Sequence, residues 1–162
     1  MKAGEKNILI GVVVFVVVVM VYRTFVISQD GGKDKGIPFY STAPKELQNE
    51  ALLEMKKQKC RDCHTLWTQR NIMQTVPSPP LDGIGSIRDE EWLFNYFSAK
   101  DPQTILPSRL KPEFRMPSYA ALPEERRRLL AKYMDSLKVE DWYLEETKKR
   151  EYEKLTGEKY TP

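Results

Sequence analysis

Three residues of the kinds that bind metals or carry redox chemistry lie in one short segment. Cys60, Cys63 and His64 form the pattern C-x-x-C-H, and they include both cysteines and the only histidine of the 162-residue chain. A structural zinc site needs about four ligands, mostly cysteine and histidine, which these residues alone do not supply. A thioredoxin-like dithiol also uses C-x-x-C, but it requires a βαβ context, and the flanking sequence here is typical of helix and loop.

The C-x-x-C-H pattern is the signature of c-type haem attachment. In that chemistry the two thiols add to the two vinyl groups of the haem and form thioethers. The adjacent histidine is carried under the iron and becomes its proximal ligand. The pattern therefore predicts one covalent haem c, bound through Cys60 and Cys63 with His64 as an iron ligand.

Residues 44–138 resemble the class I cytochrome c family. The C-x-x-C-H motif is highly specific, whereas the other matching segments are weak singly and gain strength from their order. In chain order these segments are Leu53-Glu54-Met55, Pro79-Pro80-Leu81-Asp82-Gly83-Ile84-Gly85, Glu91-Trp92-Leu93, Arg115-Met116-Pro117 and Leu122-Pro123-Glu124-Glu125. Met55 departs from the pattern, because the family usually has an aromatic residue there.

The resemblance implies that the backbone carbonyl of Pro79 accepts a hydrogen bond from His64 and orients the imidazole. The alternative is that Pro79 is a plain turn residue. Arg115 is a candidate partner of a haem propionate through a charge-assisted bond, although such an arginine is more often simply solvated.

The second iron ligand must be something other than histidine, because His64 is the only one. Among the six methionines, Met116 is the best candidate, since it lies far beyond His64 in a proline-bounded loop between two predicted helices. Met73 follows His64 closely and is expected on the proximal side. Methionine–histidine ligation is typical of cytochromes c, and it raises the reduction potential and leaves no open iron position.

Three helices are predicted over residues 44–60, 89–99 and 123–137. Apolar residues recur at helical spacing in them, as Leu47 and Met55 do in the first. No segment alternates with a two-residue period, so the predicted fold class is all-α with little or no sheet. Such short helices leave a small core, and a largely buried haem would supply the missing apolar bulk.

An apolar run from Ile8 to Ile27, broken only by Arg23 and Thr24, precedes this domain. It is long enough to cross a bilayer core of about 30 Å. A cleaved signal peptide is the alternative, but no A-x-A-like site follows the run. We therefore predict a single transmembrane helix over residues 1–28 and a glycine-rich flexible tether over residues 29–43.

The charges that flank the apolar run do not decide its orientation. Because c-type haem is attached in the bacterial periplasm, we predict a single-pass protein of the bacterial inner membrane with its haem domain in the periplasm. The net charge of +3 gives no case for nucleic-acid binding.

Residues 139–162 lie beyond the resemblance and are predicted to be a C-terminal extension. Its large apolar side chains are Trp142, Tyr143, Leu144, Tyr152, Leu155 and Tyr160. The extension either folds back on the domain or docks on a partner subunit, and its aromatic content favours the partner.

The expected function is the transfer of single electrons, as a subunit of a respiratory or photosynthetic complex or as a tethered shuttle for one. The alternative is a haem enzyme such as a peroxidase, which needs an open iron position and usually a polar distal group. The lack of a second histidine and the presence of Met116 argue against that alternative.

Overall fold

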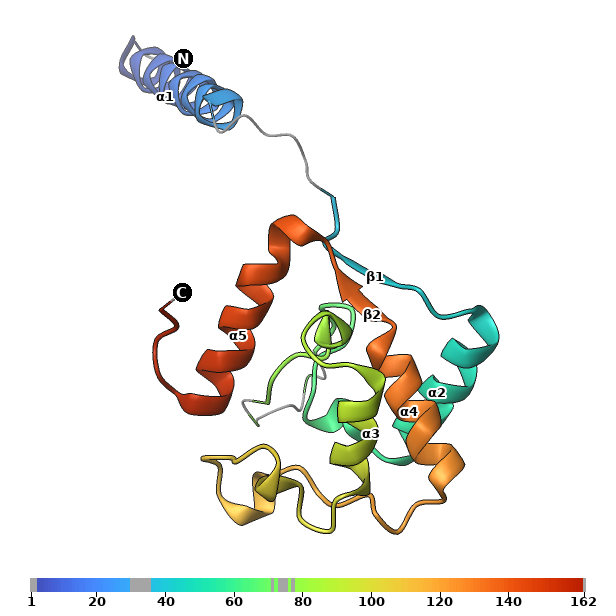
Figure 1. Cartoon of the computed structure of the whole chain (residues 1–162). Coiled ribbons are helices and arrows are strands. Elements are labelled where there is room, and N and C mark those ends of the chain that lie inside the picture. Colours follow the sequence, from blue (N-terminus) through green and yellow to red (C-terminus); the bar gives the residue numbers. More distant parts are fainter. Residues whose placement is uncertain (1–2, 30–35, 71, 73–75, 77, 162) are drawn as a thin grey trace. The chain divides into compact units, whose positions relative to one another are not determined.

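The computed structural model describes residues 3–29, 36–70, 72, 76 and 78–161. The chain divides into two compact units, Met1–Gly36 and Ile37–Pro162 (Figure 1). Each unit is a separate body. Met73 lies outside the described residues, as do Gly31 and Gly32 of the predicted tether.

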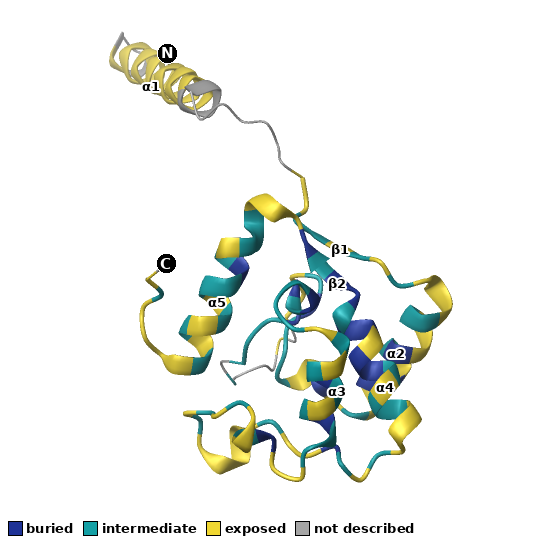
Figure 2. Cartoon of the chain, in the orientation of Figure 1, coloured by how far each residue is buried: buried dark blue, intermediate teal, exposed yellow. Residues whose placement is uncertain are grey.

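The first unit contains the helix α1 (Ala3–Gln29). Its segment Lys6–Phe25 is 20 residues long, has a mean hydropathy of 2.6 and is exposed throughout (Figure 2). The hydroxyl of Thr24 donates to the carbonyls of Met20 and Val21, so this polar side chain is satisfied within the helix. The predicted N-terminal helix is therefore present, and by length and composition it can cross a membrane.

The second unit is mostly helical, and the three helices predicted for it are confirmed to within a few residues. Asp89 caps one of them, because its carboxylate accepts a hydrogen bond from the backbone N–H of Trp92 at 2.8 Å. The α-helices of this unit are α2 (Lys45–Lys57), α3 (Glu90–Ser98), α4 (Glu124–Asp135) and α5 (Leu144–Thr156). Short 3₁₀ turns are η1 (Cys60–Asp62), η2 (Ile84–Ser86), η3 (Pro102–Thr104), η4 (Pro112–Phe114) and η5 (Asp141–Tyr143).

The core lies where α4 packs against α2 and α3, and Figure 2 shows the buried residues gathered there. Its members are Ala51, Met55, Cys60, Leu66, Leu81, Leu93, Phe97, Tyr119, Leu130, Ala131, Tyr133, Met134 and Leu137. The predicted apolar helix faces are therefore largely buried. Trp92 and Tyr96 of α3 are only partly buried, because both line an open cavity. Their rings stack on each other, with 5.2 Å between the ring centroids.

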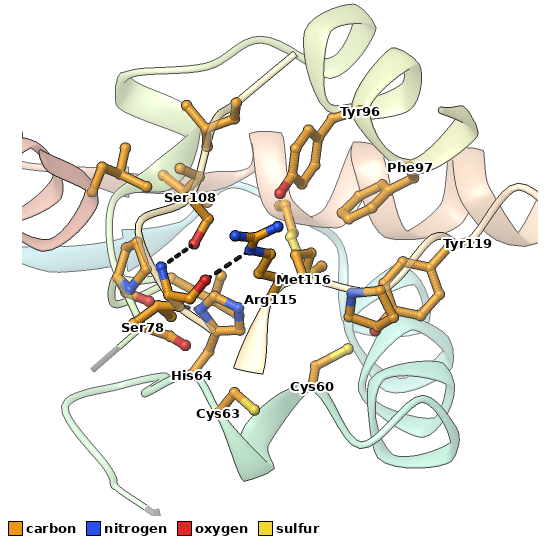
Figure 3. A pocket seen from close by; sticks show the side chains of 18 of the residues that line it. Cys60, Cys63, His64, Ser78, Tyr96, Phe97, Ser108, Arg115, Met116 and Tyr119 are labelled. Carbon is orange, nitrogen blue, oxygen red and sulfur yellow. Dashed lines mark hydrogen bonds between the residues drawn. The ribbon is translucent and has the colours of Figure 1, made fainter. Parts of the chain in front are cut away.

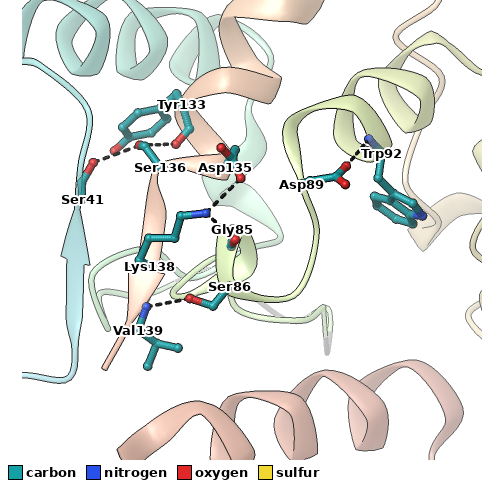
Figure 4. Close-up of polar contacts among 10 residues, drawn as sticks. All are labelled: Ser41, Gly85, Ser86, Asp89, Trp92, Tyr133, Asp135, Ser136, Lys138 and Val139. Carbon is teal, nitrogen blue, oxygen red and sulfur yellow. Dashed lines mark hydrogen bonds and ion pairs between the residues drawn. The ribbon is translucent and has the colours of Figure 1, made fainter. Parts of the chain in front are cut away.

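A small sheet corrects the prediction of an all-α fold. The strands β1 (Phe39–Ser41) and β2 (Leu137–Val139) pair antiparallel, with Phe39 opposite Val139. Figure 4 shows how side chains fix this pair: the hydroxyls of Ser41 and Ser136 hydrogen-bond at 3.0 Å, and the backbone N–H of Val139 donates to the Ser86 hydroxyl. Strands of three residues are too short to show a two-residue alternation, so the sequence carried no signal for them.

The observed boundaries also differ from the predicted ones at both ends of the domain. β1 lies inside the predicted tether over residues 29–43, and the folded unit begins at Ile37. The predicted extension over residues 139–162 belongs to the same unit. A Cβ at Gly83, which has a φ of +79°, would lie 3.0 Å from the Cβ of Val139 and 3.2 Å from the Cγ2 of Thr147. The extension is therefore folded back on the domain, while docking of a partner on it stays a prediction.

Gly85 is expected to be the least replaceable glycine of the domain. A Cβ there would lie 1.9 Å from the backbone oxygen of Asp135, which is a collision with backbone at the end of α4. Overpacking of this kind costs about 1–3 kcal/mol, so Gly85→Ala should lower the free energy of unfolding by about 3 kcal/mol. Urea unfolding of the full chain in detergent measures this loss.

Gly157→Ala is the control for this prediction. Gly157 has a φ of +76°, but the nearest atoms to a Cβ added there belong to the flexible end of the Arg109 side chain, at 3.0 Å. The free energy of unfolding should fall by about 1 kcal/mol, because alanine is strained in a left-handed backbone conformation. Equal losses for the two variants would contradict the role assigned to the contact between Gly85 and the backbone of Asp135.

Candidate functional site

A cavity of about 420 Å³ brings the predicted site residues together. Ligand cavities of proteins are about 300–1,000 Å³ and mostly apolar. The predicted binding residues that line this one are Cys60, Cys63, His64, Pro79, Arg115 and Met116. Figure 3 shows all of these except Pro79 in one pocket with Tyr96, Phe97 and Tyr119. Apolar lining comes from Leu81, Ile84, Leu93, Leu106, Leu110, Phe114 and Met134.

The turn after α2 holds the two cysteines and the histidine close together. Lys59 has a left-handed backbone, with a φ of 57°, and this reverses the chain at the end of the helix. The backbone carbonyl of Cys60 then accepts hydrogen bonds from the N–H groups of Cys63 at 3.3 Å and His64 at 3.0 Å. The spacing C-x-x-C-H is thereby folded into a single short turn that faces the cavity.

His64 is oriented by a backbone carbonyl, as the resemblance implied. Its Nδ1 lies 2.7 Å from the carbonyl oxygen of Pro79. A carbonyl oxygen only accepts, so Nδ1 must donate the proton, and in the neutral ring Nε2 then carries none. Burial also lowers the pKa of His64, which favours the neutral ring. A neutral imidazole with a free Nε2 is the form that binds a metal ion.

The cysteines have the properties of unreactive thiols rather than of a redox pair. Neither forms a disulfide bond, and burial raises the pKa of Cys60 to about 11 and also raises the pKa of Cys63. Reactive dithiols of the thioredoxin kind have a lowered thiol pKa. The thioredoxin-like alternative therefore does not fit this site.

A zinc site built from side chains does not fit either. Among the residues that the structure describes, no group of three or more histidine, cysteine, aspartate or glutamate side chains could hold a metal ion. A closed zinc site needs about four such ligands.

Met116 reaches the cavity from the loop between η4 and α4. Gln103 donates through its side-chain amide to the backbone carbonyl of Met116 at 3.4 Å. The Ser118 hydroxyl donates to the carbonyl of Ala99 at 2.7 Å, which joins this loop to the end of α3. Hydrogen bonds at Met116 itself and two residues after it therefore attach this loop to η3 and to the end of α3.

Arg115 is exposed, but its side chain has a defined position. Its Nε donates to the backbone carbonyl of Leu110 at 2.7 Å, and the guanidinium lies within the pocket (Figure 3). The remaining guanidinium N–H groups can donate hydrogen bonds to an anionic group in the cavity. Its predicted pairing with a propionate stays a prediction.

Two residues of α5 line the same cavity, and they were not predicted. They are Glu151 and Leu155. Thr147, Glu151 and Leu155 are spaced at i, i+4 and i+8, so they share one face of the helix. That spacing predicts that the three residues share a packed helix face, but it does not predict which surface that face covers.

No family model matches this chain, and no curated protein or solved structure matches it significantly. The functional argument therefore rests on the residues of the site.

Proposed function

We propose that residues 37–162 form a monohaem c-type cytochrome domain of the class I kind, which transfers single electrons. The observation that carries this proposal is the arrangement of donors around one apolar cavity. It is lined by the buried thiol of Cys60, the partly buried thiol of Cys63, a neutral imidazole whose Nδ1 is engaged by Pro79, and the thioether of Met116. This is the donor set by which cytochromes c hold haem.

The cavity residues fit a haem in three further respects. Cys60 and Cys63 form no disulfide bond, and burial favours the protonated thiol of each, so both sulfur atoms can form a thioether. The mostly apolar wall suits a large apolar ring. Arg115 supplies a cation at the cavity for an acidic substituent. A bound haem would supply an iron that gains and loses one electron.

The residues of this chain would then set the behaviour of the site. His64 would hold the metal from one side, and the hydrogen bond to Pro79 would keep its ring orientation and raise its basicity. Met116 would hold it from another segment of the chain. If His64 and Met116 both held the iron, no position would be left for a substrate, and this would favour electron transfer over peroxidase chemistry.

We further propose that α1 anchors this domain in the bacterial inner membrane, with the domain in the periplasm. The exposed apolar segment Lys6–Phe25 supports the anchor. An anchor raises the effective concentration of the domain near membrane partners. Such partners would be redox proteins or subunits of a respiratory or photosynthetic electron-transport complex.

Covalent attachment is the direct test of the haem proposal. Full-length protein purified from a host with c-type haem maturation should be coloured, and acidified acetone should not remove the pigment. Cys60→Ala/Cys63→Ala should lose the covalent pigment, because no other thiol is present to form a thioether. Absorption spectra before and after extraction measure both results. A colourless wild-type protein would refute the proposal.

A further inference from the structure

The helix α5 separates the cofactor cavity from a second hollow at the surface. This hollow has a volume of about 430 Å³, and the exposed side chains Tyr152 and Thr156 at its rim open it to solvent. Glu151 and Leu155 line both spaces. These two side chains therefore form part of the wall that the two spaces share.

Glu151 is the ionisable member of this wall. Its carboxylate lies 3.3 Å from the guanidinium of Arg88, and its side chain is only 12% exposed. Arg88 in turn stacks on the ring of Trp92, with 4.8 Å to the ring centroid, and Trp92 also lines the cavity. The carboxylate is thus a partly dehydrated charge at the edge of the cofactor site.

The surroundings of Glu151 favour its protonated form more than water does. Burial raises the pKa of Glu151, and the charge of Arg88 offsets this only in part. An added negative charge on the cavity side would raise the pKa further, because like charges interact strongly where water is scarce. Protonation of Glu151 is therefore easier than that of an ordinary exposed glutamate.

We propose, resting on the function proposed above, that Glu151 couples one proton to each electron that the site accepts. When a one-electron donor reduces the site, the Glu151 carboxylate takes up one proton from water in the outer hollow and becomes a carboxylic acid. When the site is oxidised, the acid returns that proton to water. Charge balances, because one electron and one proton arrive and leave together.

Other charged and titratable groups surround the same two spaces. In the outer hollow they are Arg88, Lys148, Tyr152 and Tyr160. In the cavity, apart from the predicted binding residues, they are Lys59, Asp62, Tyr96, Glu113 and Tyr119. Glu151 differs from each of them, because it is the only carboxylate that lines both spaces among the described residues.

The sign of the pH dependence follows from this coupling. Below the pKa values of Glu151 in both oxidation states the group is always protonated, and above both it is always ionised, so the reduction potential does not depend on it. Between the two values each electron brings a proton, and the potential falls as the pH rises. The limiting slope is about 59 mV per tenfold change in proton concentration for one electron.

The test is a redox titration of the full-length protein in detergent, repeated from about pH 4 to about pH 9. The wild type should show a sloping region. Glu151→Gln, which keeps the shape of the side chain but cannot titrate, should remove it. Glu145→Gln is the matched control, because Glu145 lies on the same helix with its side chain 65% exposed and pairs with Lys148. The control should keep the wild-type slope.

A second variant and a second measurement keep the test decisive should Glu151→Gln fail to fold. Arg88→Gln should move the sloping region to higher pH, since the cation that favours the ionised form is gone. Reduced-minus-oxidised infrared spectra of the wild type should show a carboxylic-acid C=O band that appears on reduction.

The outcomes separate this inference from the function on which it rests. An unchanged slope in a coloured Glu151→Gln protein, or a wild-type infrared difference spectrum without the acid band, would overturn the role of Glu151 and leave the haem proposal standing. A colourless wild type would overturn both.

Discussion

Met116→His should lower the reduction potential on the order of 0.2 V, a fraction of the roughly 0.8 V over which axial ligands tune haem iron. A thioether stabilises reduced iron, whereas an imidazole donates more strongly to oxidised iron. Cys60 and Cys63 are untouched, so the pigment should remain covalent. Redox titration of the full-length protein, followed by absorption, measures the change.

Met55→Leu is the matched control for this substitution. Met55 is 1% exposed in the core on α2, and it does not line the cavity. A volume-conserving change there costs under about 1.5 kcal/mol and should leave the potential unaltered. An equal potential in the wild type and Met116→His would remove Met116 as the ligand.

Carbon monoxide offers an independent measure of the same assignment. The wild type should bind it slowly or not at all, because Met116 would occupy the position that the gas needs. Rapid binding at neutral pH would favour the haem-enzyme alternative instead.

Removal of residues 141–162 should weaken the domain and expose the cofactor cavity. This truncation keeps β2 but deletes η5 and α5, and with them the packing of Thr147 on Gly83 and the two cavity residues Glu151 and Leu155. Side chains of this size contribute about 1–2 kcal/mol each when buried, so the expected loss is on the order of 4 kcal/mol. Urea unfolding measures this loss.

A shorter truncation separates α5 from the residues that follow it. Loss of residues 158–162 removes Tyr160, whose ring contacts Tyr152 at 5.7 Å, but leaves the helix and its cavity-facing side intact. The free energy of unfolding of this variant should fall by about 1 kcal/mol or less. If the longer truncation proved equally mild, α5 would not be part of the site, and the interpretation of residues 139–162 as a docking segment alone would gain support.

The helices and the core residues could be predicted because their signals are local. Asp89 precedes an acidic first turn, and Leu130, Tyr133 and Met134 repeat at helical spacing. The structure has helices at these places and buries Leu130, Tyr133 and Met134. All of β1 was predicted as tether because a strand of three residues has no period of its own, and its partner is at the other end of the domain.

The chemistry proposed for the site follows from residue types and their order along the chain. Cys60, Cys63 and His64 are neighbours in sequence, so their proximity could be predicted without the fold, and the scarcity of histidine leaves few candidates for a second ligand. Tertiary structure alone placed Glu151 beside Arg88 and on the wall of the cavity. The reason is physical: a glutamate on a charged helix has the same local pattern whether it faces water or a cofactor site, and only packing against distant segments decides which.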